Sequence, residues 1–184
     1  MKWEDLKVYK PIEKTELTNA KKVIESVVSY KLEQYGFRKI GKKLIRKSND
    51  LIHLIILDSR GSWSGSSNSL KVQVAVVSIY DVDILVNNYE PISNTFIENL
   101  KPDLKNYYQI TREYELFAQF ISTKIEQIIL PYFDKYSSST DVIEKGIEHG
   151  ITKNLIDLCE KSKNIEFKEE LEFRKQVVKK KLKI

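Results

Sequence analysis

Residues 35–57 constrain the fold more than any other part of this 184-residue chain. Gly36 closes an amphipathic segment, at the position where a helix commonly ends in a left-handed residue. Two short stretches of strand-like sequence then flank Gly41-Lys42, a pair that is typical of a tight turn. The run 51–57 is too short and too apolar for a surface helix. The segment therefore predicts a helix end, a basic hairpin and a central strand buried on both faces.

The segment before Gly36 predicts an amphipathic helix, because its apolar residues recur at helical spacing. Either Thr15 or Thr18 can cap this helix, since a threonine hydroxyl accepts a hydrogen bond from a free backbone N–H. Beyond the central strand, residues 70–77 alternate in a pattern that predicts a second strand with one face fully buried.

A long helix is expected over residues 111–130, with Leu116 on its inner apolar stripe. Pro131 is expected to end or kink this helix, because proline lacks the backbone N–H that a helix interior uses.

Further helices are expected toward the C-terminus. Asp141, with Glu144 three residues later, forms a capping arrangement for a short helix that ends at Gly150. Two more helices are predicted over 152–161 and 166–183. The last has acids in its first half and lysines in its second, an order that complements the helix dipole.

These elements predict an α+β fold with a small antiparallel sheet of three to four strands. The N-terminal helix and the long central helix would pack on the sheet. We expect an α+β core domain over residues 1–136 and a C-terminal helical extension over 137–184 that packs on the core. The alternative is that the C-terminal helices form a separate lobe.

The run LEQYGFRKIGKKLIRKSNDLIHLIILDSR, residues 32–60, resembles the uncharacterised bacterial family called domain of unknown function 4304. The run IEQIILPYFDKYSS, residues 125–138, is similar to that family's helix ending in a Leu-Pro pair. The chain departs from the family pattern by lacking an aromatic near Ile45 and a glutamine near Asp58. The resemblance covers roughly residues 15–140, and it implies a fold and a bacterial source but no activity.

Positive charge is concentrated in two segments of a chain whose net charge is +5. Residues 36–50 hold six basic residues and one acid, and residues 165–184 hold seven basic residues and four acids. The rest of the chain is mildly acidic. A basic hairpin and a basic tail indicate an anionic partner, or else solvated edges that keep the protein soluble.

The hairpin carries the strongest binding candidates. Strand alternation counted along the sequence predicts that Arg38, Lys42 and Arg46 share one face and that Lys39, Lys43 and Lys47 share the other. Binding to nucleic acid would require the cations to converge on one face. Lysines on an edge strand also block unwanted strand pairing, which is a purely structural use. The candidate binding residues in the hairpin are Arg38, Lys42, Lys43, Arg46 and Lys47.

The loop 58–68 supplies two more candidates, Arg60 and Trp63. Tryptophan is enriched at binding hot spots, so an exposed Trp63 would be the best contact residue in this loop. The loop is rich in glycine and serine but lacks the Gly-Lys-Ser/Thr ending and the following helix of a phosphate loop. The same missing helix argues against a nucleophile elbow at its serines.

Residues that could support catalysis are scattered. His53 lies inside the apolar run, where a lone histidine is more often a satisfied core residue than a catalyst. His149 and Cys159 have no paired spacing with it, so no metal site is predicted. Asp81 and Asp83 could perform acid–base chemistry or form a solvated strand end. We therefore expect no cofactor, and the balance leans against an enzyme.

The favoured function is that of a non-enzymatic protein that binds another protein, such as an accessory or toxin-neutralising protein. The first alternative is nucleic-acid binding through the hairpin and the C-terminal lysines. The second is a hydrolase or transferase of unknown substrate. A cytoplasmic location is expected, because no apolar stretch approaches about 18 residues and acids occupy the place of a signal peptide's apolar core. The single Cys159 agrees with a reducing compartment.

Overall fold

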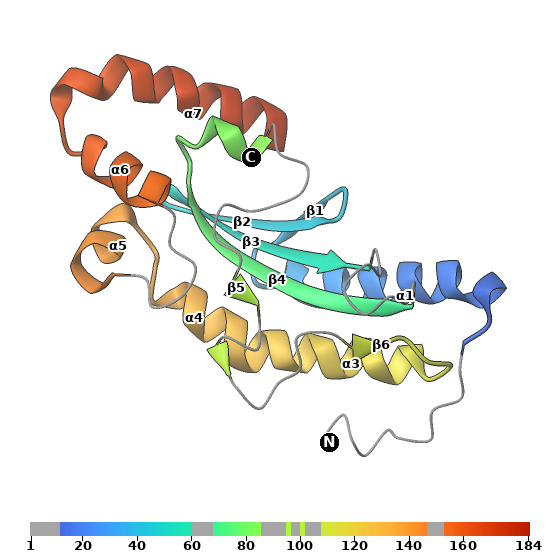
Figure 1. Cartoon of the computed structure of the whole chain (residues 1–184). Helices are drawn as coiled ribbons and strands as arrows, with labels where there is room; N and C mark the ends of the chain where they lie inside the picture. The colour runs from blue at the N-terminus through green and yellow to red at the C-terminus, as the bar shows by residue number, and fades with distance from the viewer. Residues whose placement is uncertain (1–11, 60–67, 86–94, 97–99, 102–107, 147–152) are drawn as a thin grey trace.

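A computed structural model describes residues 12–59, 68–85, 95–96, 100–101, 108–146 and 153–184 (Figure 1). Within these ranges the elements follow one another as α1 (Lys14–Glu33), β1 (Arg38–Ile40), β2 (Lys43–Ser48), β3 (Leu51–Asp58), β4 (Ser69–Ser78), η2 (Val82–Leu85), β5 (Thr95–Phe96), β6 (Tyr108–Gln109), α3 (Tyr114–Lys124), η3 (Ile125–Ile129), α4 (Leu130–Asp134), α5 (Ser139–Lys145), α6 (Lys153–Lys161), η4 (Ile165–Phe167) and α7 (Lys168–Leu182).

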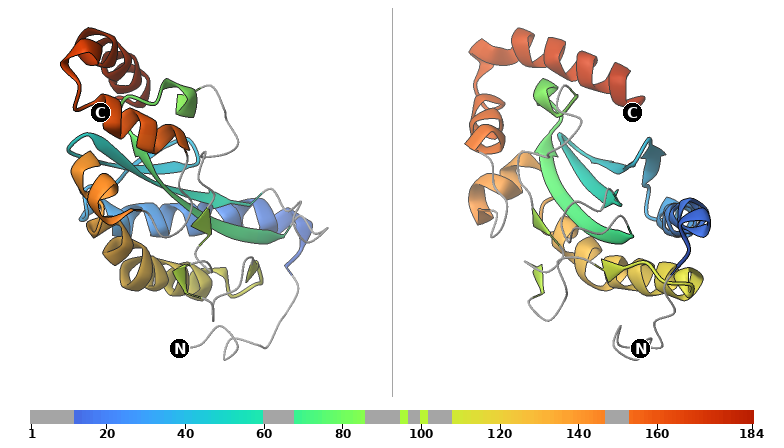
Figure 2. Two further views of the ribbon diagram at one scale, coloured as in Figure 1. Left: turned by 60° about the vertical axis from the view of Figure 1, so that its left-hand side comes forward. Right: turned by 45° about the vertical axis from the view of Figure 1, so that its right-hand side comes forward.

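The strands form one antiparallel sheet in the order β1-β2-β3-β4-β5, and β6 pairs with the start of β4. The predicted α+β class is confirmed, but three to four strands is too few. The additional strands β5 and β6 are two residues long. Strand β6 lies within residues 106–110, a further candidate strand from the sequence, whereas β5 is too short to produce an alternating pattern. Helices α1, α3 and α4 cover one face of the sheet, and α7 crosses over the other (Figures 1 and 2).

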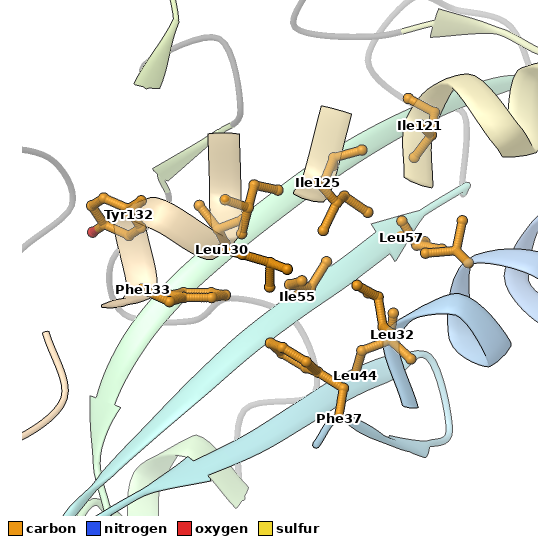
Figure 3. Close-up of a cluster of buried hydrophobic side chains, with 14 of the residues drawn as sticks. Leu32, Phe37, Leu44, Ile55, Leu57, Ile121, Ile125, Leu130, Tyr132 and Phe133 are labelled. Carbon is orange, nitrogen blue, oxygen red and sulfur yellow. The ribbon is translucent and has the colours of Figure 1, made fainter. Parts of the chain in front are cut away.

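We name the two faces of the sheet by these helices. The α1 face carries Leu44, Leu51 and Ile55, which belong to a large apolar cluster with α1, α3 and α4. The α7 face carries Ile45 and Ile52, together with the other members of a smaller cluster that includes α7. Figure 3 shows side chains from the helices and strands meeting in the larger cluster.

Strand β3 is buried at all eight positions, which confirms the prediction of a central strand covered on both faces. Strand β4 is also buried at all ten positions, although its alternating pattern predicted only one fully buried face. Its polar residues Lys71 and Gln73 are only 7% and 2% exposed. The sequence prediction failed here because those side chains look solvent-facing by residue type alone.

Helix α1 ends where predicted but begins earlier. Gly36 has φ +80°, which confirms the expected left-handed residue after the helix. The helix starts at Lys14, and its N-cap residue Glu13 makes no side-chain capping hydrogen bond. The prediction that Thr15 or Thr18 caps the helix is therefore wrong, since both lie inside it.

The long helix continues through Pro131. Between α3 and α4 it winds as a π-helical segment, in which the Leu130 N–H donates to the Ile125 carbonyl five residues back. Pro131 sits in the first turn of α4, so the wide turn lies where the proline cannot donate to the regular helical ladder. Leu116, expected on the inner stripe, is 42% exposed and that prediction is wrong.

Helix α5 begins with a capping box made by Ser138 and Asp141. Asp141 is therefore the third residue of the helix, and the predicted pairing of Asp141 with Glu144 is wrong. The helix ends at Lys145 with Gly146 as its C-cap, while the predicted end at Gly150 lies outside the described residues.

The C-terminal helices pack on the sheet and its helices. Val142, Leu155 and Cys159 belong to the larger apolar cluster, and Val178 and Leu182 belong to the smaller one. The division into residues 1–136 and 137–184 stays a prediction.

Candidate binding surface on the α7 face

The register of the β1–β2 hairpin decides which cations share a face. Ile40 pairs with Lys43 across a two-residue turn, and Arg38 pairs with Ile45. Gly41 has φ +59° at the first turn position, as in a type II′ hairpin turn. Directly opposed residues share a face, so Arg38 lies on the α7 face with Ile45.

The predicted division of the cations is therefore wrong. Arg38, Lys43 and Lys47 share the α7 face, whereas Lys39 and Arg46 lie on the α1 face. Counting alternation straight along the sequence fails because a two-residue turn pairs even-numbered residues of β1 with odd-numbered residues of β2.

The cations on the α1 face are held by acidic partners. Lys39 Nζ lies 2.9 Å from a carboxylate oxygen of Glu25. An Nη of Arg46 lies 2.9 Å from Oδ1 of Asp134, and the Arg46 side chain is only 18% exposed. The Arg46 guanidinium also stacks over the Phe37 ring at 5.2 Å from its centroid. Arg46 thus stabilises the fold, and it contributes little to any surface.

His53 lies opposite Arg46 in the neighbouring strand, and both of its ring nitrogens have partners. Nδ1 accepts a hydrogen bond of 3.1 Å from Nε of Arg46, so the ring proton resides on Nε2, which lies 2.7 Å from the carbonyl of Tyr136. The ring stacks on Phe133 with a centroid distance of 4.5 Å. Burial, with a further contribution from the Arg46 charge, lowers the pKa of His53 to about 4. The prediction of a satisfied core histidine is confirmed.

The cations on the α7 face differ from those on the α1 face. Arg38 and Lys47 are exposed and have no ion-pair partner within the described ranges. Lys43 is half-buried, and burial lowers its pKa below the ordinary value for lysine. Lys42 is exposed at the tip of the turn. Burial, with a further contribution from the charge of Lys42, lowers the pKa of Lys21 on α1, so Lys42 is not assigned to the α7 face.

Helix α7 brings the second basic segment to this same face. Val178 is fully buried, and with Leu182 it packs in one apolar cluster with Ile45 of the hairpin. Ile184, two residues after the end of the helix, and Ile40 of β1 pack against that cluster. Figure 2 shows the C-terminal end of α7 beside the hairpin.

The charges along α7 are paired in the first half of the helix only. Nε of Arg174 lies 2.8 Å from Oε1 of Glu170, and Nζ of Lys175 lies 3.3 Å from Oε2 of Glu172. The lysines of the last turn, Lys179, Lys180 and Lys181, have no acidic partner in the part of the chain that the structure describes. Two basic segments that are far apart in sequence therefore converge. We call this surface the basic face, and it comprises Arg38, Lys43, Lys47, Lys179 and Lys181.

The remaining candidates from the sequence are placed as follows. Arg60 and Trp63 lie outside the described residues. Asp81 is 2% exposed and accepts hydrogen bonds from the Asp83 backbone N–H at 3.0 Å and from Nδ2 of Asn154 at 2.9 Å. Asp81 thus links the start of η2 to α6. It does not form a solvent-exposed pair of carboxylates with Asp83 that could perform acid–base chemistry.

Cys159 is 1% exposed, and burial raises the pKa of its thiol to about 12. A thiol with such a pKa is a poor nucleophile at neutral pH, and Cys159 packs in the larger apolar cluster as a small hydrophobic residue. Among the described residues, no group of three or more histidine, cysteine, aspartate or glutamate side chains is placed to hold a metal ion.

A second surface feature lies along α1 and was not found from the sequence. Tyr30 is 80% exposed and borders an open cavity of about 700 Å³. The cavity is lined by Ser26, Val27, Tyr30, Lys31, Glu33 and Gln34. The sequence feature that could have indicated this surface is Tyr30, an aromatic residue on the polar side of an amphipathic helix.

Comparison of the chain with protein-family models, curated proteins and solved structures gives no match. Within the described ranges, no helix combines the length and the apolar character needed to cross a bilayer. The resemblance to domain of unknown function 4304 therefore stays a prediction.

Proposed function

We propose that this chain is a non-enzymatic binding protein whose basic face contacts the phosphate backbone of double-stranded nucleic acid. The observation that carries the proposal is the convergence of two basic segments on the α7 face. On the opposite face the hairpin cations Lys39 and Arg46 are each paired with an acid, whereas Arg38 and Lys47 have no such partner among the described residues. Cations that are exposed and unpaired retain their full charge for a partner.

The side-chain types on the basic face favour phosphate contacts over base stacking. Residues 38–48 contain lysines and arginines but no aromatic side chain, and stacking on aromatic rings is what holds single-stranded bases. Backbone contacts position a duplex without reading its sequence. We therefore expect binding that is strongly dependent on salt and nearly independent of base sequence.

The test is fluorescence anisotropy with a labelled 20-base-pair DNA duplex (a length of about two helical turns) over a series of salt concentrations. Arg38→Gln combined with Lys47→Gln should weaken binding and reduce the slope of log K against log salt by about 2. Both side chains are exposed and unpaired among the described residues, so the double variant should keep its stability.

The matched control combines Lys14→Gln with Lys22→Gln, which removes the same charge from exposed positions on α1. The proposal is wrong if the wild-type chain does not bind the duplex at low salt, or if the control variant loses as much affinity as the test variant. Equal binding of the wild type to an uncharged polymer would also contradict it.

A second candidate function, protein binding, is favoured by the cavity along α1. The exposed Tyr30 and the half-buried Val27 give this surface an aromatic and an aliphatic contact, and tyrosine is common at binding hot spots. A photo-crosslinking amino acid at position 30 should yield a discrete adduct in host cells. The same amino acid at Lys22, an exposed position on the same helix, should yield none.

A further inference from the structure

Helix α7 has an outward side that carries exposed apolar residues. Its inward side is formed by Leu171, Val178 and Leu182, all of which are buried. On the opposite side Phe173 is 69% exposed, and Ile165 in the preceding turn is 82% exposed. Burying a large apolar side chain is favourable relative to leaving it in water. These two residues therefore point to a surface that a partner covers.

Charges flank Phe173 on this outward side in a definite order. Glu166 and Glu169 precede it, and Lys180 and Lys183 follow it, all of them exposed. The spacings of four and seven residues place Glu169, Phe173 and Lys180 on one side of an α-helix. Glu169 and Lys180 have no ion-pair partner in the part of the chain that the structure describes. The helix dipole accounts for acids first and lysines last, but it does not account for the exposed Phe173.

We propose that this outward side binds α7 of a second copy of the chain in antiparallel orientation. A helix with acids at one end and lysines at the other is complementary to itself when reversed. With Glu169 opposite Lys180 of the other copy, Phe173 falls against Gln176. The same pairs recur with the two copies exchanged, as a two-fold axis requires.

The contact is small, because α7 has 15 residues and is about 22 Å long. Such a contact gives a weak dimer whose population depends on protein concentration. The proposal does not rest on nucleic-acid binding, since Glu169, Phe173 and Lys180 are not part of the basic face. Dimer formation is measured without any nucleic acid, so each proposal can fail alone.

The test is sedimentation equilibrium of the full chain at protein concentrations up to about 1 mM, the upper end of weak association. Glu169→Lys alone and Lys180→Glu alone each turn two attractive pairs of the dimer into two repulsive ones. Each should weaken dimerisation about tenfold. The combined exchange, E169K with K180E, restores both pairs and should restore the dimer. Phe173→Ser should also weaken it.

Glu144→Lys is the matched control, because it makes the same charge change at an exposed position of α5, and it should leave the dimer unchanged. Circular dichroism establishes that α7 remains helical in each variant. A chain that is monomeric throughout the concentration range overturns the proposal. So does a dimer that the single exchanges leave unchanged, or one that the combined exchange does not restore.

Discussion

Nε of Arg46 donates a hydrogen bond to Nδ1 of His53, the residue directly opposite it in the β2–β3 pair. The same guanidinium reaches Asp134 at the end of α4, and the far nitrogen of the histidine reaches the carbonyl of Tyr136. Two adjacent strands are thereby tied to the C-terminal end of the central helix. The polar groups are satisfied inside an otherwise apolar layer, so removing one of them leaves another without a partner.

Arg46→Met should lower the free energy of unfolding by about 2 kcal/mol. Methionine retains part of the apolar stem, but it leaves Nδ1 of the buried His53 without its donor. Urea denaturation monitored by circular dichroism measures the change. Lys47→Met is the matched control on the same strand, because Lys47 is exposed and should shift stability by less than about 0.5 kcal/mol. Equal effects at the two positions would contradict the role assigned to Arg46.

The stability of the protein should fall in mild acid because of His53. Its pKa is lowered from 6.5 in the unfolded chain to about 4 in the fold. Between these values the unfolded chain binds the proton and the folded protein does not, so stability rises with pH in that window. The full contribution is present above pH 6.5, and up to about 3 kcal/mol is lost as the pH falls to 4.

Urea denaturation of the wild type and of His53→Gln at pH 5 and pH 7 tests this expectation. The variant should show a much smaller difference between the two pH values, because it lacks the group whose pKa shifts. If both proteins lose the same stability between pH 7 and pH 5, another group is responsible.

The start of α5 offers a test of its capping box. Ser138→Ala should destabilise the protein by about 1 kcal/mol, because the hydroxyl accepts from the Asp141 backbone N–H. Hydrogen bonds from Lys145 and Ser137 hold the pKa of Asp141 well below its usual range. Glu144→Ala should have almost no effect, since Glu144 is exposed and takes no part in the box. A larger loss from Glu144→Ala, measured by thermal unfolding, would reverse the assignment.

Gly36 should tolerate asparagine better than alanine. Its φ of +80° is costly for a residue with a Cβ atom, whereas the nearest atoms to an added Cβ, those of the Arg46 side chain, lie 3.9 Å away. The cost therefore comes from the backbone, and we expect about 1 kcal/mol for Gly36→Ala and less for Gly36→Asn. Denaturant midpoints compare the two variants. Equal losses would indicate crowding in place of backbone strain.

Local features of the fold could be predicted from the sequence. The strand over the apolar run 51–57 and the left-handed conformation of Gly36 were both predicted correctly. Each is determined by residues that are adjacent in the sequence. The π-helical segment before Pro131 could not be predicted, because the choice between ending a helix and widening it depends on what the following residues pack against. Phe133, two residues later, is fully buried against His53.

The candidate surface was predicted only in part. Arg38, Lys43 and Lys47 were identified as binding candidates by their charge. Their common face depends on the pairing register, which a two-residue turn shifts. The contribution of α7 depends on Val178 and Leu182 packing on a sheet more than 100 residues earlier in the chain, and a single sequence does not reveal such a contact.

The strand order has a kinetic consequence. Strands β1, β2 and β3 are consecutive and pair through turns of two residues, at 41–42 and 49–50. Helix α1 is held to the central helix by the ion pair of Lys31 with Glu126, and Tyr35, just after α1, donates a hydrogen bond to the same Glu126, 91 residues away. Closing a short loop costs far less chain entropy than closing a long one, so the strands should associate before the helices dock. Changes at the turns should then act mainly on the folding rate, and changes at Glu126 mainly on the unfolding rate.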